Sequence, residues 1–288
     1  MNYGMPYKGS KNKIAKWVLD RLPDGDVFVD LFGGGGAITH AAALSGKYNR
    51  IIYNDIDPLV SKAFKTAVNG GFRNERRWIS REDFFRLKDT DFYVVMCFSF
   101  GNGLKDYAYS KEVEPWKKAL HYARIFGDLS EFAKFGIKTD GSRADIKAHK
   151  DEYKKAYIDW YMRENSESLQ SLERLQSLEI YNTDYQNIEI PPDSVIYCDI
   201  PYRNTGGYRC DFDYERFYRW AKTQDNIYIS EYNMPDDFRT VASIEKAVTM
   251  CSGGDKKAVE KLFTPKLSKS VIICEGFIYD TDLFSLYA

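Results

Sequence analysis

The residues best suited to chemistry are Asp199, Ile200, Pro201 and Tyr202, which stand together in the second half of the chain. The apolar run 195–198 before them is typical of a short buried strand. Pro201 ends that strand because it has no N–H for the ladder, and it restricts Ile200 to extended geometry. A carboxylate and an aromatic ring are thus predicted at the carboxyl end of a strand, where open α/β sheets bind ligands.

A second candidate site is the glycine run 33–36, which follows an apolar strand at 27–32 and precedes a helix at 37–45. Strand, glycine-rich turn and helix are the first unit of a Rossmann-like fold, since glycine lets the backbone turn tightly and approach a cofactor. Asp55 lies about 20 residues further on, where an acid normally accepts hydrogen bonds from ribose hydroxyls. A dehydrogenase fits this stretch too, but Thr39 replaces the last glycine of the nicotinamide fingerprint.

These motifs together resemble the Dam-type DNA adenine methyltransferases, phage members included. Residues 199–202 are similar to the Asp-Pro-Pro-Tyr motif of amino-methyltransferases, and residues 30–36 are similar to their glycine motif. Residues 7–11 resemble the N-terminal aromatic-x-Gly-x-Lys segment of the family. The order of the parts along most of the chain is also that of the family, which transfers a methyl group from S-adenosylmethionine to an adenine amine.

The resemblance implies a set of residues that bind S-adenosylmethionine. On residue patterns alone, residues 7–11 fit the start of an ordinary helix equally well, and Asp184 fits a helix cap. A lysine beside helix N-terminal amides would suit an anionic group such as the methionine carboxylate. The implied cofactor-binding residues are Tyr7, Lys11, Asp30, Phe32, Gly33, Gly34, Gly35, Gly36, Asp55, Ile56, Asp184 and Asp199.

The resemblance also implies a catalytic role for residues 199–202. An aromatic amine is a poor nucleophile because its lone pair is delocalised, and attack on a sulfonium methyl needs that lone pair in line with the S–methyl bond. Asp199 would accept one N–H of the amine and the Ile200 carbonyl would accept the other, while Tyr202 stacks on a base that has left the duplex. The family more often has proline at position 200, but a backbone carbonyl does not depend on that side chain, so we expect activity without any metal.

Alternating strands and helices predict an α/β protein built on a Rossmann-like methyltransferase sheet. The sheet is expected to be mostly parallel, with an antiparallel C-terminal edge hairpin formed by strands at about 241–250 and 271–279. A mainly helical insert at 72–164 interrupts this alternation. The catalytic domain would therefore comprise residues 1–71 and 165–288, with the insert as the target-recognition domain.

The insert combines a mild basic bias with interleaved aromatic residues, which suits contacts with phosphates and bases. A solvated helical face with a few core aromatics explains this composition at least as well. Residues 97–104 resemble the segment that joins the family's catalytic and recognition domains, although the Asn-Gly pair there is also a good hairpin turn. The residues expected to contact DNA are Lys8, Asn102, Lys105, Tyr107 and Tyr109.

The composition is that of a globular protein with a formal net charge of −1. No apolar run reaches the length of a membrane span, and the N-terminus lacks a signal-peptide core, so we expect a cytoplasmic protein. Five scattered cysteines and three isolated histidines predict neither a disulfide frame nor a metal site. With so little net charge, affinity for DNA would depend on a local basic face.

The favoured interpretation is a site-specific adenine methyltransferase that uses S-adenosylmethionine, acts on duplex DNA and could be paired with a cognate restriction endonuclease. Three alternatives within enzymes stay open, namely methylation of an RNA base, of a cytosine amine or of a protein glutamine. An insert of about 90 residues favours a nucleic-acid reader over the glutamine enzymes. A non-catalytic binding module on the same fold is the remaining alternative, and the intact Asp199, Pro201 and Tyr202 argue against it.

Overall fold

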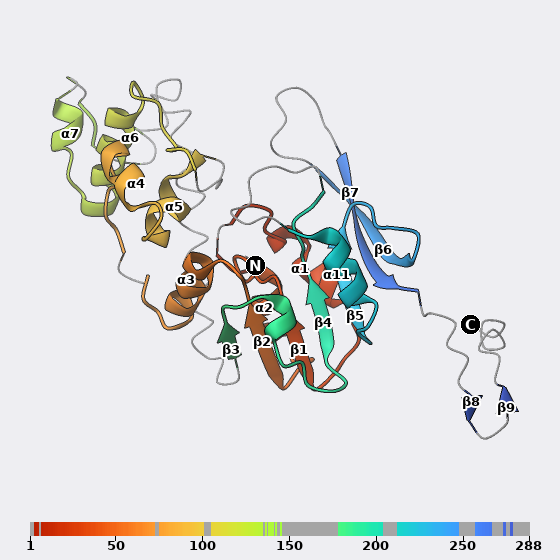
Figure 1. The fold of residues 1–288 in the computed structure, drawn as a ribbon. Coiled ribbons are helices and arrows are strands. Elements are labelled where there is room, and N and C mark those ends of the chain that lie inside the picture. The colour runs from red at the N-terminus through yellow and green to blue at the C-terminus, as the bar shows by residue number, and fades with distance from the viewer. Residues whose placement is uncertain are drawn as a thin grey trace.

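The structure is a computed structural model of the chain, drawn as a ribbon in Figure 1. It describes residues 3–5, 7–72, 75–100, 105–134, 136, 138–140, 142, 145, 178–203, 212–247, 257–266, 273–274 and 277–278. Within these ranges, no helix combines the length and the apolar character needed to cross a membrane. A long helix is suggested by the pattern of residues 145–178, of which 146–177 lie outside the described part, as do residues 204–211 after the Asp199 motif.

A seven-stranded sheet forms the centre of the described chain, in the order β3-β2-β1-β4-β5-β7-β6 (Figure 1). The first five strands of that order pair in parallel, and β7 joins β5 in antiparallel orientation. The prediction of a mostly parallel Rossmann-like sheet with an antiparallel edge is therefore confirmed. The strands are β1 (Val27–Asp30), β2 (Arg50–Asn54), β3 (Leu178–Tyr181), β4 (Val195–Cys198), β5 (Ile227–Glu231), β6 (Phe238–Ala247) and β7 (Lys257–Pro265).

Helices cover both faces of the sheet, which explains why β1 and β4 are buried along their whole length and are apolar except for Asp30 at the end of β1. On one face, α1 (Ala15–Leu19) and α2 (Ala37–Ser45) pack against Phe28 of β1 and its neighbours. On the other face, α11 (Tyr214–Ala221) packs against Val29 and the alternate residues of β4. This two-sided burial fixes the register of the central strands, and with it the positions of the polar residues at their ends.

The described helices of the insert lie to one side of the sheet, beyond α3 (Figure 1). Phe84 and Phe92 from these helices share one buried cluster with Tyr53 of β2 and Phe64 of α3. Ser80 starts the first of them as its pattern predicts, because its Oγ accepts the Asp83 N–H at 3.1 Å. The helices in this region are α3 (Pro58–Val68), α4 (Arg81–Leu87), α5 (Phe92–Phe98), α6 (Glu114–His121) and α7 (Ser130–Ala133).

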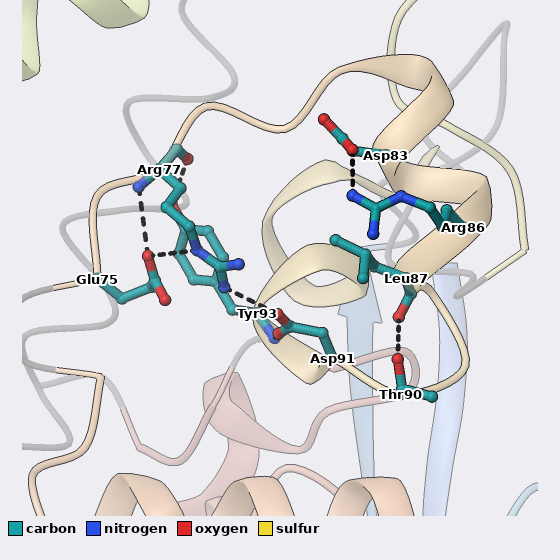
Figure 2. A network of polar contacts seen from close by, with 8 residues as sticks. All are labelled: Glu75, Arg77, Asp83, Arg86, Leu87, Thr90, Asp91 and Tyr93. Atoms are coloured by element: carbon teal, nitrogen blue, oxygen red, sulfur yellow. Dashed lines mark hydrogen bonds and ion pairs between the residues drawn. The ribbon is translucent and has the colours of Figure 1, made fainter.

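Two arginines of the insert, Arg77 and Arg86, are paired with acids in the structure. Arg77 donates to Glu75 at 2.9 Å and to Asp91 at 2.8 Å, and Arg86 donates to Asp83 at 2.5 Å (Figure 2). The Tyr93 hydroxyl also donates to the Arg77 carbonyl at 2.9 Å, so this arginine joins the start of α5 to the preceding loop. These contacts neutralise the charges of two arginines that contribute to the basic bias of the insert.

The edge hairpin pairs β6 with β7, and the predicted position of its second strand is wrong. That strand spans Lys257–Pro265, whereas the pattern predicted it at 271–279, where the structure has two short strands, β8 (Ile273–Cys274) and β9 (Phe277–Ile278). The reason is Glu260, which is fully buried on β7. A charged residue on the buried face breaks the hydrophobic alternation by which a strand is recognised in a sequence.

Candidate active site

The sheet has its topological switch point between β1 and β4, because the chain runs outward to β2 on one side and to β5 on the other. Ligands bind outside the carboxyl ends of the strands at such a point. A cavity of about 210 Å³ opens at this place. The sequence-predicted residues that line it are Tyr7, Lys8, Lys11, Asp30, Phe32, Gly33, Gly34, Gly35, Asp55, Ile56, Asp184, Asp199 and Pro201.

The glycine turn is held by tight contacts that leave no room for side chains. The Tyr53 hydroxyl donates to the Gly34 carbonyl at 2.8 Å, and the Gly34 N–H donates to Asp55 Oδ2 at 2.8 Å. Asp55 Oδ1 accepts the Asp57 N–H at 2.8 Å, so each oxygen of the Asp55 carboxylate accepts a hydrogen bond from a backbone N–H group. Burial raises the pKa of Asp55 to about 6, although these backbone donors oppose the shift.

Gly36 begins α2 and does not line the cavity, but its conformation shapes the turn. Its φ is +71°, and a Cβ built there would lie 2.1 Å from a ring carbon of Phe64. Gly36→Ala should therefore destabilise the protein by about 2–4 kcal/mol, the sum of a left-handed backbone cost and an overpacking cost. The denaturant midpoint of unfolding measures this change.

Gly46 provides a matched control at the other end of the same helix. Its φ is +69°, but nothing lies within 4 Å of the position that a Cβ would take. Gly46→Ala should cost only the backbone term, about 1–2 kcal/mol. Equal midpoints for the two variants would contradict the collision with Phe64.

Asp30 ends β1 at the floor of the cavity and is only 1% exposed. The Thr39 hydroxyl donates to its Oδ2 at 2.7 Å, whereas its Oδ1 has no hydrogen-bond partner among the described residues. Burial, together with the nearby carboxylates of Asp199 and Asp55, raises the pKa of Asp30 to about 7. An unsatisfied buried acceptor of this kind is costly unless a ligand completes it.

Asp199 forms a close ion pair with Lys11, from the other end of the chain. The Lys11 ammonium lies 2.6 Å from one Asp199 carboxylate oxygen and 2.8 Å from the other, and the lysine is 5% exposed. Burial alone would lower the pKa of Lys11, but the carboxylates of Asp199 and Glu260 outweigh it and raise that pKa. Lys11 is therefore charged, and it fixes the orientation of the Asp199 carboxylate.

Ile200 and Tyr202 surround Asp199 without lining the cavity themselves. The Ile200 side chain is 1% exposed and packs in the core, so position 200 can offer the cavity only its backbone. The Tyr202 ring is 7% exposed, packs edge-on against Tyr232 at a centroid distance of 4.7 Å, and donates its hydroxyl to Glu260. Sequence reasoning missed Glu260 because it lies 58 residues from the motif with no pattern of its own.

Arg216 is a second residue that the sequence did not indicate. It lines the cavity from α11 and lies 3.1 Å from Asp184 Oδ2, while its Nε donates to Gln186 at 2.9 Å. Asp184 also accepts the Gln186 N–H at 3.0 Å, as a capping aspartate does. Asp184 therefore both caps a turn and borders the cavity.

The five residues expected to contact DNA lie in different environments, and one of them is not described. Tyr107 and Tyr109 are 6% and 7% exposed, and the Tyr107 hydroxyl donates to the Ile79 carbonyl at 2.8 Å. The expectation that these two rings face DNA is wrong, because each packs in the buried cluster that the insert shares with β2 and α3. Lys105 is exposed, Lys8 lines the cavity, and Asn102 lies outside the described residues.

Among the described residues, the histidine, cysteine and acidic side chains do not gather into a group of three or more that could hold a metal ion. The acids around the cavity are instead engaged with Lys11, Arg216, Thr39 or backbone N–H groups.

A comparison with protein families matches residues 7–227 to the D12 class N6 adenine-specific DNA methyltransferases. The chain belongs to this family. The matched residues contain the glycine turn, the Asp199 motif and the whole lining of the cavity, and they end before β6 and β7. No curated protein matches the sequence.

This D12 class methyltransferase is accordingly an adenine-specific DNA methyltransferase, an enzyme that acts on the N6 amine. Methyltransferases of such families generally use S-adenosylmethionine. The dehydrogenase alternative, which the glycine turn alone left open, does not fit this family.

Proposed function

We propose that this enzyme transfers a methyl group from S-adenosylmethionine to the N6 amine of an adenine that has left duplex DNA. The observation that carries the proposal is the position of Asp199, on the wall of a switch-point cavity that is also lined by the glycine turn and by Asp30 and Asp55. The catalytic domain would comprise residues 1–71 and 165–288, and residues 72–164 would read the target sequence.

The cavity residues fit S-adenosylmethionine in three respects. Asp30 Oδ1, buried without a partner in the described part of the chain, suits the ammonium of the methionine moiety. Each Asp55 oxygen accepts one backbone N–H and has a further lone pair that can accept a hydrogen bond from a ribose hydroxyl. Phe32 and Ile56, the latter 50% exposed, give the cavity apolar walls suited to the adenine ring.

The residues around Asp199 orient the target amine. When bound, the cofactor supplies a methyl group activated by its sulfonium. Asp199 can keep its contacts with Lys11 and still accept an N–H, because an ionised carboxylate has about four acceptor sites. The Ile200 carbonyl accepts the second N–H, and the Tyr202 ring stacks on the base. These contacts align the amine lone pair with the methyl group, which is a gain from orientation.

A methyl-transfer assay with labelled S-adenosylmethionine tests the proposal. Duplex DNA of mixed sequence, RNA of matching sequence and a sample without nucleic acid are incubated side by side, and the products are digested to separate the bases. We expect label only in N6-methyladenine from DNA. Label in cytosine or in RNA would contradict the substrate, and 2-aminopurine at the target position would report the extrusion of the base by its fluorescence.

Lys105 provides a test of the insert as the DNA reader. Its side chain is exposed, so Lys105→Ala should weaken DNA binding equally for all sequences and reduce the slope of log affinity against log salt by about 1. Lys134→Ala is the control, because the Lys134 ammonium is already paired with Glu131 at 2.8 Å. A salt slope unchanged from wild type in Lys105→Ala would contradict a phosphate contact at this position.

A further inference from the structure

Glu260 is a buried carboxylate in the part of the chain that the family match does not cover. It is 0% exposed on β7, two residues from the equally buried Leu262. Residues two apart on a strand share a face, so an apolar side chain would satisfy the fold at this position. Burial raises the pKa of Glu260 to about 7, which is the cost of placing a carboxylate here.

Glu260 contacts the two side chains that lie beside Asp199, those of Tyr202 and Lys11. It accepts the Tyr202 hydroxyl, and one of its oxygens lies 3.8 Å from the Lys11 ammonium. The Lys11 ammonium also lies 4.6 Å from the centre of the Tyr202 ring. Glu260, Tyr202, Lys11 and Asp199 therefore form one continuous polar group beside the carboxyl end of β4, which Glu260 reaches from the first half of the antiparallel β7.

Two carboxylates compete for the ammonium of Lys11. With Asp199 as its sole acid, the ammonium would be attracted only toward the oxygens that the adenine amine must reach. Glu260 attracts it from a second position and at the same time fixes the rotation of the Tyr202 hydroxyl. Truncating one member of such a group changes the geometry of the others, since buried polar networks act as a unit.

We propose that Glu260 is a positioning residue for methyl transfer, which holds the Tyr202 ring and, as a second counter-charge, fixes the position of the Lys11 ammonium beside Asp199. This inference rests on the proposed function of Asp199 and Tyr202. It also assigns a role to the β6–β7 hairpin, which completes the active site by pairing Ser230 with Leu262 and Glu231 with Lys261 at the end of β5.

The test compares Glu260→Gln with wild type in single-turnover methyl transfer to duplex DNA. Glutamine keeps the volume and can still accept from Tyr202, but it removes the second counter-charge for Lys11. We expect the transfer rate to fall by about 10–100-fold, as for a small displacement of reacting groups. The dissociation constant for S-adenosylmethionine, measured by calorimetry, should change by less than about twofold because Glu260 does not line the cavity.

A second readout does not depend on activity. In protein labelled with ¹³C at the tyrosine Cζ, the Tyr202 resonance is assigned by its loss in Tyr202→Phe. Glu260→Gln should shift that resonance in the free protein. Glu260→Met, which keeps the length and removes the polar contacts, should lower the transfer rate at least as much. The protein should stay folded, because Lys11 keeps its closer acidic partner Asp199 at 2.6 Å.

Glu179→Gln is the matched control, since it removes a carboxylate paired with Arg50 on β3, at the opposite edge of the sheet, and should leave transfer unchanged. A shifted Tyr202 resonance with a wild-type transfer rate would overturn the positioning role, and so would an unshifted resonance. Transfer by wild type together with an unimpaired Glu260→Gln variant overturns only this inference. A wild-type protein that does not methylate DNA would overturn the proposed function and this inference with it.

Discussion

Replacing Asp199 with alanine should lower the methyl-transfer rate by about 10²–10⁴-fold, the range typical of a positioned proton acceptor. The alanine cannot accept an N–H from the adenine amine, so the nitrogen lone pair stays delocalised. Cofactor affinity should be largely retained, because Asp30 and Asp55 bound the cavity independently of Asp199. Single-turnover transfer and calorimetric titration with S-adenosylmethionine measure the two quantities separately.

The same substitution also removes the closest partner of a buried lysine. Lys11 would keep the more distant Glu260, at 3.8 Å, as its acidic partner among the described residues, so Asp199→Ala should destabilise the protein by up to about 3–5 kcal/mol. The assay temperature must therefore lie well below the unfolding midpoint of the variant, which is measured by thermal unfolding.

Asp193→Ala controls for this loss of stability. Asp193 precedes β4, is exposed and has a φ of +60°, so alanine there should cost about 1–2 kcal/mol without touching the cavity. Transfer by this variant should equal that of wild type. If Asp199→Ala retains more than about a tenth of the wild-type rate, the assignment of Asp199 as the acceptor is wrong.

Asp30→Asn should stabilise the cofactor-free protein at pH 8, by about 2–4 kcal/mol. The wild-type carboxyl has a pKa of about 7 in the folded state and near 3.8 when unfolded, because burial disfavours its charge. Between these two pH values the folded state holds a proton that the unfolded state has lost, so the stability of wild type falls as the pH rises. Asparagine keeps the shape, can accept from Thr39 and does not titrate.

The pH profile supplies the control for this prediction. Below about pH 4 the carboxyl is protonated in both states, so the two proteins should unfold at nearly the same urea concentration. Their midpoints should separate through the window from about pH 4 to 7 and stay apart above it. A constant difference at every pH would mean that the stabilisation does not come from the charge of Asp30.

Cofactor binding should show the opposite effect of the same substitution. An ammonium beside Asp30 favours the ionised carboxylate, so wild type should release protons on binding S-adenosylmethionine near pH 7. Asp30→Asn should not release these protons, and it should bind the cofactor about 10–100-fold more weakly. Calorimetry in two buffers of different ionisation enthalpy measures the release. Stability gained with affinity lost is the usual exchange at a functional site.

Local patterns in the sequence determined the parallel sheet and the place of the cavity. The apolar run before Asp199, the glycines after Asp30 and the strand before Asp55 each predict an acid at the carboxyl end of a strand, and parallel strands bring such ends to one edge. All three acids do line one cavity. These predictions succeeded because each depends on a few neighbouring residues whose backbone preferences are strong.

Tertiary structure alone decided which side chains meet across the chain. The Lys11–Asp199 pair joins residues 188 positions apart. The hydrogen bond from Tyr202 to Glu260 forms because β7 lies beside β5. The burial of Tyr107 in the insert likewise follows from helix packing, which composition does not reveal. An isolated charged or aromatic residue has the same sequence signature on a surface as in a core, and its role is set by the partners that the fold brings to it.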